Sequence, residues 1–173
     1  MMLDLREREW NVFLIDDLFD IGTGGLVERA ALRDGRVPRI SAKNVDNGIE
    51  GFYQPVAATT YREFRNFISV SFLGSVFYHP YTASLDMKIH ALRLKRRELN
   101  KGLALFLQKL IAMTAVKFSY GNQLSSSDLP RQKIIVPVCA DGMPDWDFME
   151  GYVRERETML VGRYFEFANR IEV

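Results

Sequence analysis

Apolar and polar residues in the first hundred positions alternate in short blocks that are separated by turn-forming residues. A loose alternation runs from Trp10 to Phe19 and ends at a cluster of glycines. Asn47-Gly48 is a strong signal for the turn of a β-hairpin. Alternation over blocks of this length predicts strands of a half-buried sheet. Further short strands are expected at residues 37–41, 67–70, 76–78 and 87–94.

The spacing of apolar residues changes to a helical one after residue 100. From Leu103 to Phe118 they recur at i, i+3 and i+4, which predicts an amphipathic helix with Asn100 as its cap. We expect Tyr120-Gly121 to end this helix, with Gly121 free to adopt a positive φ. A short helical turn at Ser125–Asp128 and a buried strand at Ile134–Val138 are expected to follow.

A second helix is expected to begin near Pro144 or Asp145 and to continue to the end of the chain. Its apolar residues keep a spacing near 3.5, interrupted at Arg156, which is typical of a helix that packs along a partner helix. The stripe consists of Met149, Val153, Leu160, Tyr164, Phe167 and Ile171. The expected fold is therefore mixed α/β (α+β): one domain over residues 1–143, with several short strands around a core helix, and a C-terminal helix over residues 144–173.

Composition fits one globular domain and argues against several other classes. The 173 residues are 47% hydrophobic and 12% aromatic, enough for a sizeable core. No apolar run reaches the roughly 18 residues of a membrane span, and the charged N-terminus does not resemble a secretory signal. Cys139 is the only cysteine, which is typical of the reducing cytoplasm. One cysteine and two histidines argue against a zinc site, so no metal or cofactor is expected.

The net charge of +1 hides an uneven distribution along the chain. Between Arg29 and Lys133 there are 17 basic and 7 acidic residues, whereas the two flanks together hold 6 basic and 15 acidic residues. A basic middle between acidic ends suggests a surface for a polyanion, with protein contacts elsewhere. A solvated surface of uneven charge would have the same composition.

No catalytic motif is complete. Ile21-Gly-Thr-Gly-Gly25 lacks the third glycine of a dinucleotide loop and the Gly-Lys-Ser/Thr of a phosphate loop, so a tight turn is the better interpretation. Asp86-Met-Lys88 has the D-x-K spacing of nucleases, but no Pro-Asp element precedes it and Lys88 fits an alternating strand. His79, beside Pro80 and Tyr81, is expected in a loop, either as a packing residue or as a donor to a phosphate.

Side chains that suit nucleic acid are concentrated in four expected loops of the basic segment. Amide side chains can pair with adenine, and Arg or Lys with guanine, in the major groove of DNA. Arginine and lysine also neutralise phosphates. The candidate DNA-contacting residues are Arg36, Arg39, Lys43, Asn44, Asn47, Arg62, Arg65, Ser75, His79, Tyr81, Tyr120, Asn122 and Gln123.

Four segments together resemble a known family. They are Trp10–Asp20, Gly35-Arg-Val-Pro-Arg-Ile-Ser41, Ile68-Ser-Val-Ser-Phe-Leu-Gly74 and Tyr120–Val138. Each motif is loose, but their order and spacing resemble the target recognition domain of the DNA-specificity (S) subunits of type I and related restriction-modification enzymes. The usual Pro-Pro-x-x-Glu-Gln entry into the following helix is replaced by Ala140–Glu150, which looks closer to the type IIB and IIG-like branch.

The resemblance implies a prokaryotic, non-catalytic protein that recognises a sequence in double-stranded DNA and directs a methyltransferase or endonuclease. In that family, two recognition domains alternate with two helical spacers that pack antiparallel and bind methyltransferase subunits. The C-terminal helix is accordingly expected to bind a methyltransferase subunit or a second copy of the chain. The alternative, from another functional class, is a protein-interaction module or decoy of the same fold that does not read DNA.

Overall fold

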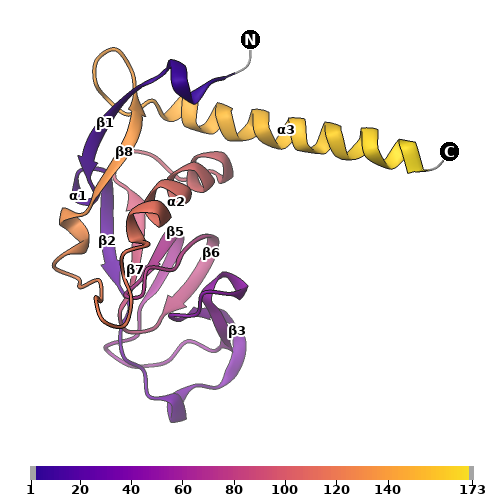
Figure 1. Cartoon of the computed structure of the whole chain (residues 1–173). Helices are drawn as coiled ribbons and strands as arrows, with labels where there is room; N and C mark the ends of the chain where they lie inside the picture. Colours follow the sequence, from indigo (N-terminus) through magenta and orange to yellow (C-terminus); the bar gives the residue numbers. More distant parts are fainter. Residues whose placement is uncertain (1–2, 172–173) are drawn as a thin grey trace.

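The computed structural model describes residues 3–171, with side chains through Arg170. Strands predominate among the elements of the first hundred residues, and a long C-terminal helix projects from the compact part (Figure 1). The strands are β1 (Glu9–Leu14), β2 (Phe19–Thr23), β3 (Asp34–Ile40), β4 (Ile49–Tyr53), β5 (Glu63–Ser71), β6 (Val76–Leu85), β7 (Ile89–Leu94) and β8 (Lys133–Val138). The helices are α1 (Ile15–Leu18), α2 (Lys101–Ala115) and α3 (Trp146–Ile171), and 3-10 turns lie at Leu5–Glu7, Arg29–Ala31, Asp46–Gly48 and Leu129–Arg131. The expectation of a mixed α/β fold is confirmed.

The strands form a two-stranded and a six-stranded sheet. β1 pairs antiparallel with β8, and the larger sheet has the order β2-β7-β5-β6-β3-β4. Its neighbours are antiparallel except for β3 and β6. The two ends of β5 lie beside Leu85 and Ile89, respectively, although only three residues separate these two. A straight strand of this length would span about 30 Å, and the connection about 14 Å at most, so β5 must bend.

A β-bulge at Asn66 produces this bend. The β5–β6 register shifts between Arg65 and Phe67, and Asn66 has a φ of 50°. Its side chain accepts a hydrogen bond from the Tyr78 hydroxyl (2.9 Å) and donates to Glu98 Oε2 (2.8 Å) and to the Leu99 carbonyl (2.9 Å). A bulge increases the local twist and re-aims the strand. The three hydrogen bonds of the Asn66 amide therefore stabilise the bend.

The bulge also explains a wrong prediction. The sequence predicts a polar, aromatic loop at Tyr78–Tyr81, but β6 continues through it. Proline is tolerated in a strand where its missing N–H is not needed for pairing. The register passes from the Phe67–His79 pair directly to the Arg65–Thr82 pair, so Pro80 lies opposite the bulge and has no ladder partner on β5.

Two hydrophobic clusters lie on the two faces of the curved sheet. One contains the buried face of α2, with Leu103, Leu107 and Ile111, packed on the sheet and on the β1–β8 pair. The other lies within the curve and contains Phe67 and Leu85. Helix α2 thus covers one face of the six-stranded sheet. On the other face the sheet curves around the second hydrophobic cluster.

Helix α2 begins as predicted but ends earlier. Asn100 Oδ1 accepts from the Leu103 N–H (3.0 Å), which confirms the cap. The helix stops at Ala115 rather than near Phe118, because the Phe118 N–H bonds to the Ala115 carbonyl (3.0 Å) in a tighter turn. This turn lets Phe118 pack against the core. Gly121 does not have the positive φ that was expected of it.

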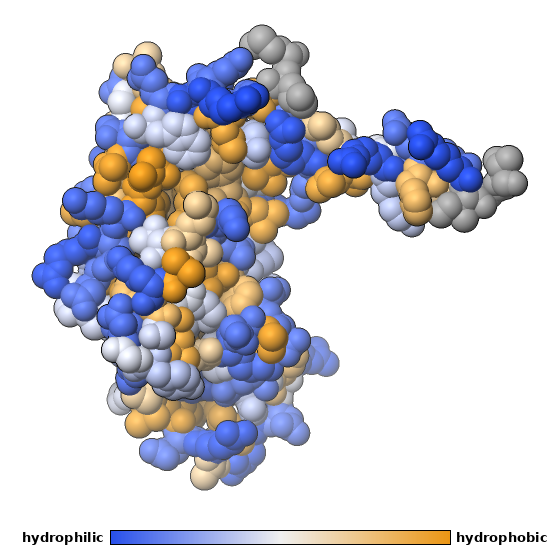
Figure 2. Space-filling view, in the orientation of Figure 1, coloured by the Kyte–Doolittle hydropathy of each residue, from blue (hydrophilic) through white to orange (hydrophobic). Residues whose placement is uncertain are grey.

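Helix α3 packs on the domain only over its first turns. Asp145 Oδ1 caps the Phe148 N–H (3.0 Å), and Phe148 and Met149 are buried. Farther along, Leu160, Tyr164 and Phe167 are 62–66% exposed. Apolar side chains are visible along the projecting helix (Figure 2). The side chain of Ile171, the last residue of the predicted stripe, lies outside the described residues. In the part of the chain that the structure describes, no helix is apolar over a length that could span a membrane.

Candidate nucleic-acid interface

Three connections meet at one end of the six-stranded sheet. They are the β5–β6 turn (residues 72–75), the β6–β7 turn (86–88) and the loop after α2 (116–124). The Phe72 N–H donates to the Lys88 carbonyl (3.1 Å), and the Phe72 carbonyl accepts from the Leu124 N–H (3.0 Å). One residue thus links all three connections. We call this surface, together with the β3–β4 connection (41–48), the loop end.

Internal contacts fix the shape of the β5–β6 turn. Gly74 has a φ of 86°, and a Cβ there would lie 2.4 Å from the Ala115 carbonyl oxygen, so only glycine fits without strain. Ser71 Oγ accepts from the Leu73 N–H (3.3 Å), the Ser75 N–H (3.1 Å) and the Ser75 hydroxyl (2.7 Å). Ser75, predicted to contact DNA, therefore donates its hydroxyl proton within the turn.

The β3–β4 connection joins the same end of the sheet. The Asp86 N–H donates to the Ile40 carbonyl (2.9 Å), which places this connection beside the β6–β7 turn. The predicted hairpin is confirmed, but its loop exceeds two residues, and both Asn47 (52°) and Gly48 (74°) have positive φ. Lys43 Nζ is held by Asp46 and the Ile49 carbonyl, each at 3.0 Å.

The side chains that this end exposes include amides, cations and the aromatic Tyr120, together with the apolar Val45, Met87 and Val116. Asn44 and Asn47 are exposed, and Tyr120 is 81% exposed. Asn122 donates to the Lys117 carbonyl (3.1 Å), and its amide oxygen has no hydrogen bond within the described residues. Arg62 is exposed beside the end of β6, where its carbonyl accepts from the Leu85 N–H (3.1 Å). Three of the four predicted loops thus supply groups to one surface.

Lys88 belongs to this surface, although sequence reasoning assigned it to a strand. It lies in the tight β6–β7 turn with a φ of 64°, and its side chain is exposed. Its ammonium is 5.0 Å from the centre of the Phe72 ring and 3.3 Å from Gln123 Oε1. Both neighbours are distant in sequence, so no local pattern could have indicated the contact.

Arg39 is not available at the surface as expected. Its side chain is 3% exposed and forms ion pairs with Glu50 (3.0 Å) and Asp86 (2.6 Å). The carboxylate of Asp86 is therefore engaged by an arginine, which also removes the metal-binding interpretation of Asp86-Met-Lys88. Within the described residues, no cluster of three His, Cys, Asp or Glu side chains is arranged to hold a metal ion.

His79 is likewise buried, and the prediction that it lies in a loop is wrong. Its Nε2 bonds to Ser69 Oγ (2.8 Å) and its Nδ1 to the Tyr81 hydroxyl (3.2 Å). Burial lowers the pKa of His79 to about 4, so the ring is neutral at pH 7. From this position, neither His79 nor the hydroxyl that Tyr81 shares with it points to a phosphate outside the protein.

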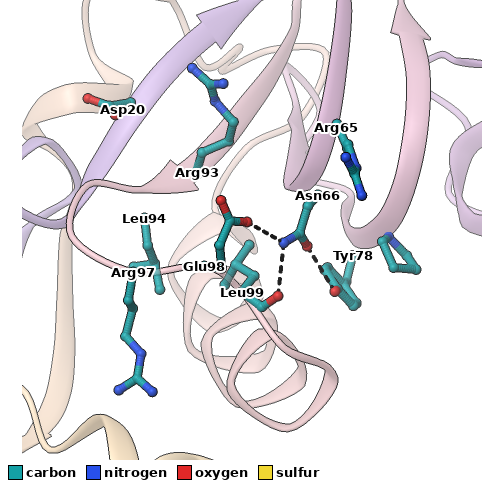
Figure 3. Close-up of a pocket in the computed structure, with 10 residues that line it drawn as sticks. Asp20, Arg65, Asn66, Tyr78, Arg93, Leu94, Arg97, Glu98 and Leu99 are labelled. Carbon is teal, nitrogen blue, oxygen red and sulfur yellow. Dashed lines mark hydrogen bonds between the residues drawn. The ribbon is translucent and has the colours of Figure 1, made fainter.

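The remaining predicted arginines lie apart from the loop end. Arg36 is exposed in the first half of β3. Arg65 lines a pocket of about 810 Å³ with Arg93 and Arg97, beside the bulge amide of Asn66. Figure 3 shows that the guanidinium groups of Arg93 and Arg97 point in opposite directions. The arginine side chains of this pocket therefore do not converge on a site for an anion. The polar groups at its centre belong to the hydrogen-bond network of Asn66, which holds the bulge.

The chain matches a family model and a curated relative. Residues 7–160 match the model described as the type I restriction modification DNA specificity domain. Specificity subunit S.BcgI of a type II restriction enzyme from Heyndrickxia coagulans is 34% identical over 165 residues, which cover 94% of this chain and 48% of the relative. The chain thus spans about half the length of that relative.

Three solved structures share the fold. The S subunit of a type I restriction-modification system from M. genitalium has a TM-score of 0.61 at 22% identity, covering 82% of this chain and 38% of that one. The HsdS subunit from Thermoanaerobacter tengcongensis has a TM-score of 0.61 at 15% identity, covering 92% and 40%. A chain from a structural study of type I system assembly and conformational transition has a TM-score of 0.64 at 16% identity, covering 96% and 43%.

Proposed function

The chain belongs to the type I restriction modification DNA specificity domain family, and from this premise we propose that it reads a sequence in double-stranded DNA. It does so as one recognition unit of a restriction-modification enzyme and catalyses no reaction itself. The observation that carries the proposal is the loop end, where four segments present amides, aromatics and cations on one surface. Such side chains read base edges in the major groove and neutralise phosphates.

The exposed groups divide between two tasks. Asn44, Asn47 and Gln123 have amides that can reach base edges and specify the sequence, whereas Arg62 is suited to positioning through a phosphate. The basic segment around them adds attraction that does not depend on sequence. Arg39, His79 and the hydroxyl of Ser75 support the fold of this surface rather than touch DNA.

Helix α3 is proposed to bind the other subunits of the enzyme. Its exposed apolar side chains beyond Met159 have no cover within the described residues, and an exposed apolar stripe of this kind marks an interaction site. We place the recognition domain at residues 1–143 and the partner-binding helix at 144–173, with the first turns of the helix packed on the domain. The partner is a methyltransferase subunit, and a second copy in antiparallel register is the simplest substitute.

Methylation mapping tests this function directly. The chain is expressed together with a cognate methyltransferase subunit in a host that lacks other methylation, and modified bases are located by sequencing. The proposal predicts a defined motif that disappears when the chain is left out. A motif that is unchanged without the chain would contradict it and favour a protein-interaction module.

A further inference from the structure

We infer that Lys88 and Gln123 act as one unit that presents only hydrogen-bond donors and selects guanine in the DNA. This inference rests on the proposed function and names a specificity-determining residue, Lys88, at the same surface. It starts from the contact between the Lys88 ammonium and Gln123 Oε1 (3.3 Å).

The contact fixes which way the Gln123 amide faces. An ammonium has three donors and no acceptor, so it can only approach the amide oxygen. The Gln123 oxygen is therefore directed to Lys88, and its NH₂ group, which has no partner within the described residues, faces solvent. At least one further N–H of Lys88 is also free. Together the two side chains offer free donors, while their one acceptor atom, Gln123 Oε1, is already engaged by Lys88.

The backbone under Lys88 is held in place before DNA binds. The φ of 64° is unusual for a residue with a side chain and costs of order 1 kcal/mol or more. The Lys88 carbonyl accepts from the Phe72 N–H (3.1 Å), while the Phe72 ring lies 5.0 Å from the ammonium. A glycine would satisfy this turn with less strain, so the presence of lysine points to a use for its side chain.

A surface that only donates distinguishes the bases in the major groove. Guanine presents two acceptors there, N7 and O6, which match two donors. Adenine presents the N6 amino group, which is itself a donor. It would face the donors of the Lys88 ammonium or the Gln123 amide and could not form a hydrogen bond with them. Without Lys88, Gln123 would favour adenine, because its amide oxygen and nitrogen could both pair with that base. With its oxygen engaged by Lys88, Gln123 is expected to favour guanine instead.

Selection from random duplex DNA with the full chain bound to a cognate methyltransferase subunit, followed by sequencing, tests the inference, because the chain alone is expected to bind weakly. Lys88→Gly removes the ammonium and suits the positive φ, so the fold of the turn is retained. Gln123→Glu keeps an acceptor for Lys88 but removes the free NH₂ group. Lys109→Ala is the matched control, because it removes one exposed lysine from α2, away from the loop end.

The wild-type chain is expected to enrich guanine at one position, and Lys88→Gly and Gln123→Glu each to lower that preference by about 10-fold to 100-fold at this position alone. Lys109→Ala should leave it unchanged. If the wild type selects a sequence but Lys88→Gly leaves it intact, or if the affected position is adenine, the inference is wrong while the proposed function stands. Absence of any selected sequence would overturn both.

Discussion

At the scale of single residues, two buried histidines place ionisable rings inside the sheet. His79 bonds to Ser69 and Tyr81, while His90 Nδ1 bonds to Thr23 Oγ1 (3.0 Å) and its Nε2 has no partner within the described residues. Both rings are at most 1% exposed, and burial lowers the pKa of each to about 4. Each histidine is therefore neutral in the folded protein at pH 7 and resists protonation.

These pKa values predict acid sensitivity. Between about pH 6.5 and 4 the unfolded chain binds more protons at these two sites than the folded chain, so the free energy of unfolding falls as pH falls through this range. From pH 7 to pH 5 each histidine should account for about 2 kcal/mol. Urea unfolding at both pH values measures this. The double variant His79→Gln, His90→Gln should show a much flatter pH dependence, and an unchanged slope would contradict the assignment.

Two exposed residues of the loop end should differ in their effect on DNA binding. Asn44→Ala should weaken the preference for one base pair by about 1–3 kcal/mol while affinity for other sequences changes little. Arg62→Ala should weaken binding to all sequences alike and lower the salt dependence by about one phosphate contact. Titration of matched and mismatched duplexes at several salt concentrations separates the two effects. Exchanged outcomes would show that their roles are assigned wrongly.

The sequence was sufficient to predict which segments and residue types form the loop end. It was not sufficient to predict which of the candidate side chains are buried. Asn44, Asn47 and Tyr120 lie in loops because their neighbours carry strong local turn signals. Arg39 is also a basic residue of the basic segment, so the sequence predicts that it contacts DNA. Its partners Glu50 and Asp86 are distant in sequence, and they neutralise its charge inside the fold. Lys88 was missed for the same reason, since Phe72 and Gln123 approach it only through the tertiary structure.

At the scale of elements, α3 has two parts with different environments. Met149 is 0% exposed and belongs to the domain core, whereas Leu160 and Phe167 are more than 60% exposed. The apolar spacing predicted a stripe along this helix that is interrupted at Arg156. The residue at which packing on the domain stops could not be predicted, because it depends on where the surface of the domain ends.

Substitutions in the two parts of α3 should therefore have opposite effects. Leu160→Glu with Phe167→Glu should leave the melting temperature of the chain nearly unchanged but abolish self-association or methyltransferase binding. Met149→Glu, the matched change on the same helix, buries a carboxylate and should destabilise the fold by several kcal/mol. Thermal unfolding and sedimentation velocity check both. An oligomer that survives the double substitution would remove the proposed role of the helix.

At the scale of the whole molecule, charge and loop placement support the same account. The basic middle of the chain contains β3 to β7, α2 and the loop end, and the acidic flanks contain β1, β2, most of β8 and α3. The central claim is that the loop end binds duplex DNA through phosphates and base edges. Because the chain spans about half of its curated relative, one recognition unit is expected to bind weakly, with a Kd of roughly 10⁻⁴ to 10⁻⁶ M at physiological salt.

The most direct test is the affinity of the full chain for duplex DNA, measured by fluorescence anisotropy as a function of salt. Binding should be detectable in low salt and should weaken steeply between about 50 and 200 mM, with a slope set by the number of phosphates neutralised. Binding that does not change with salt, preferential binding to single strands, or no binding to duplex DNA at low salt would contradict the account.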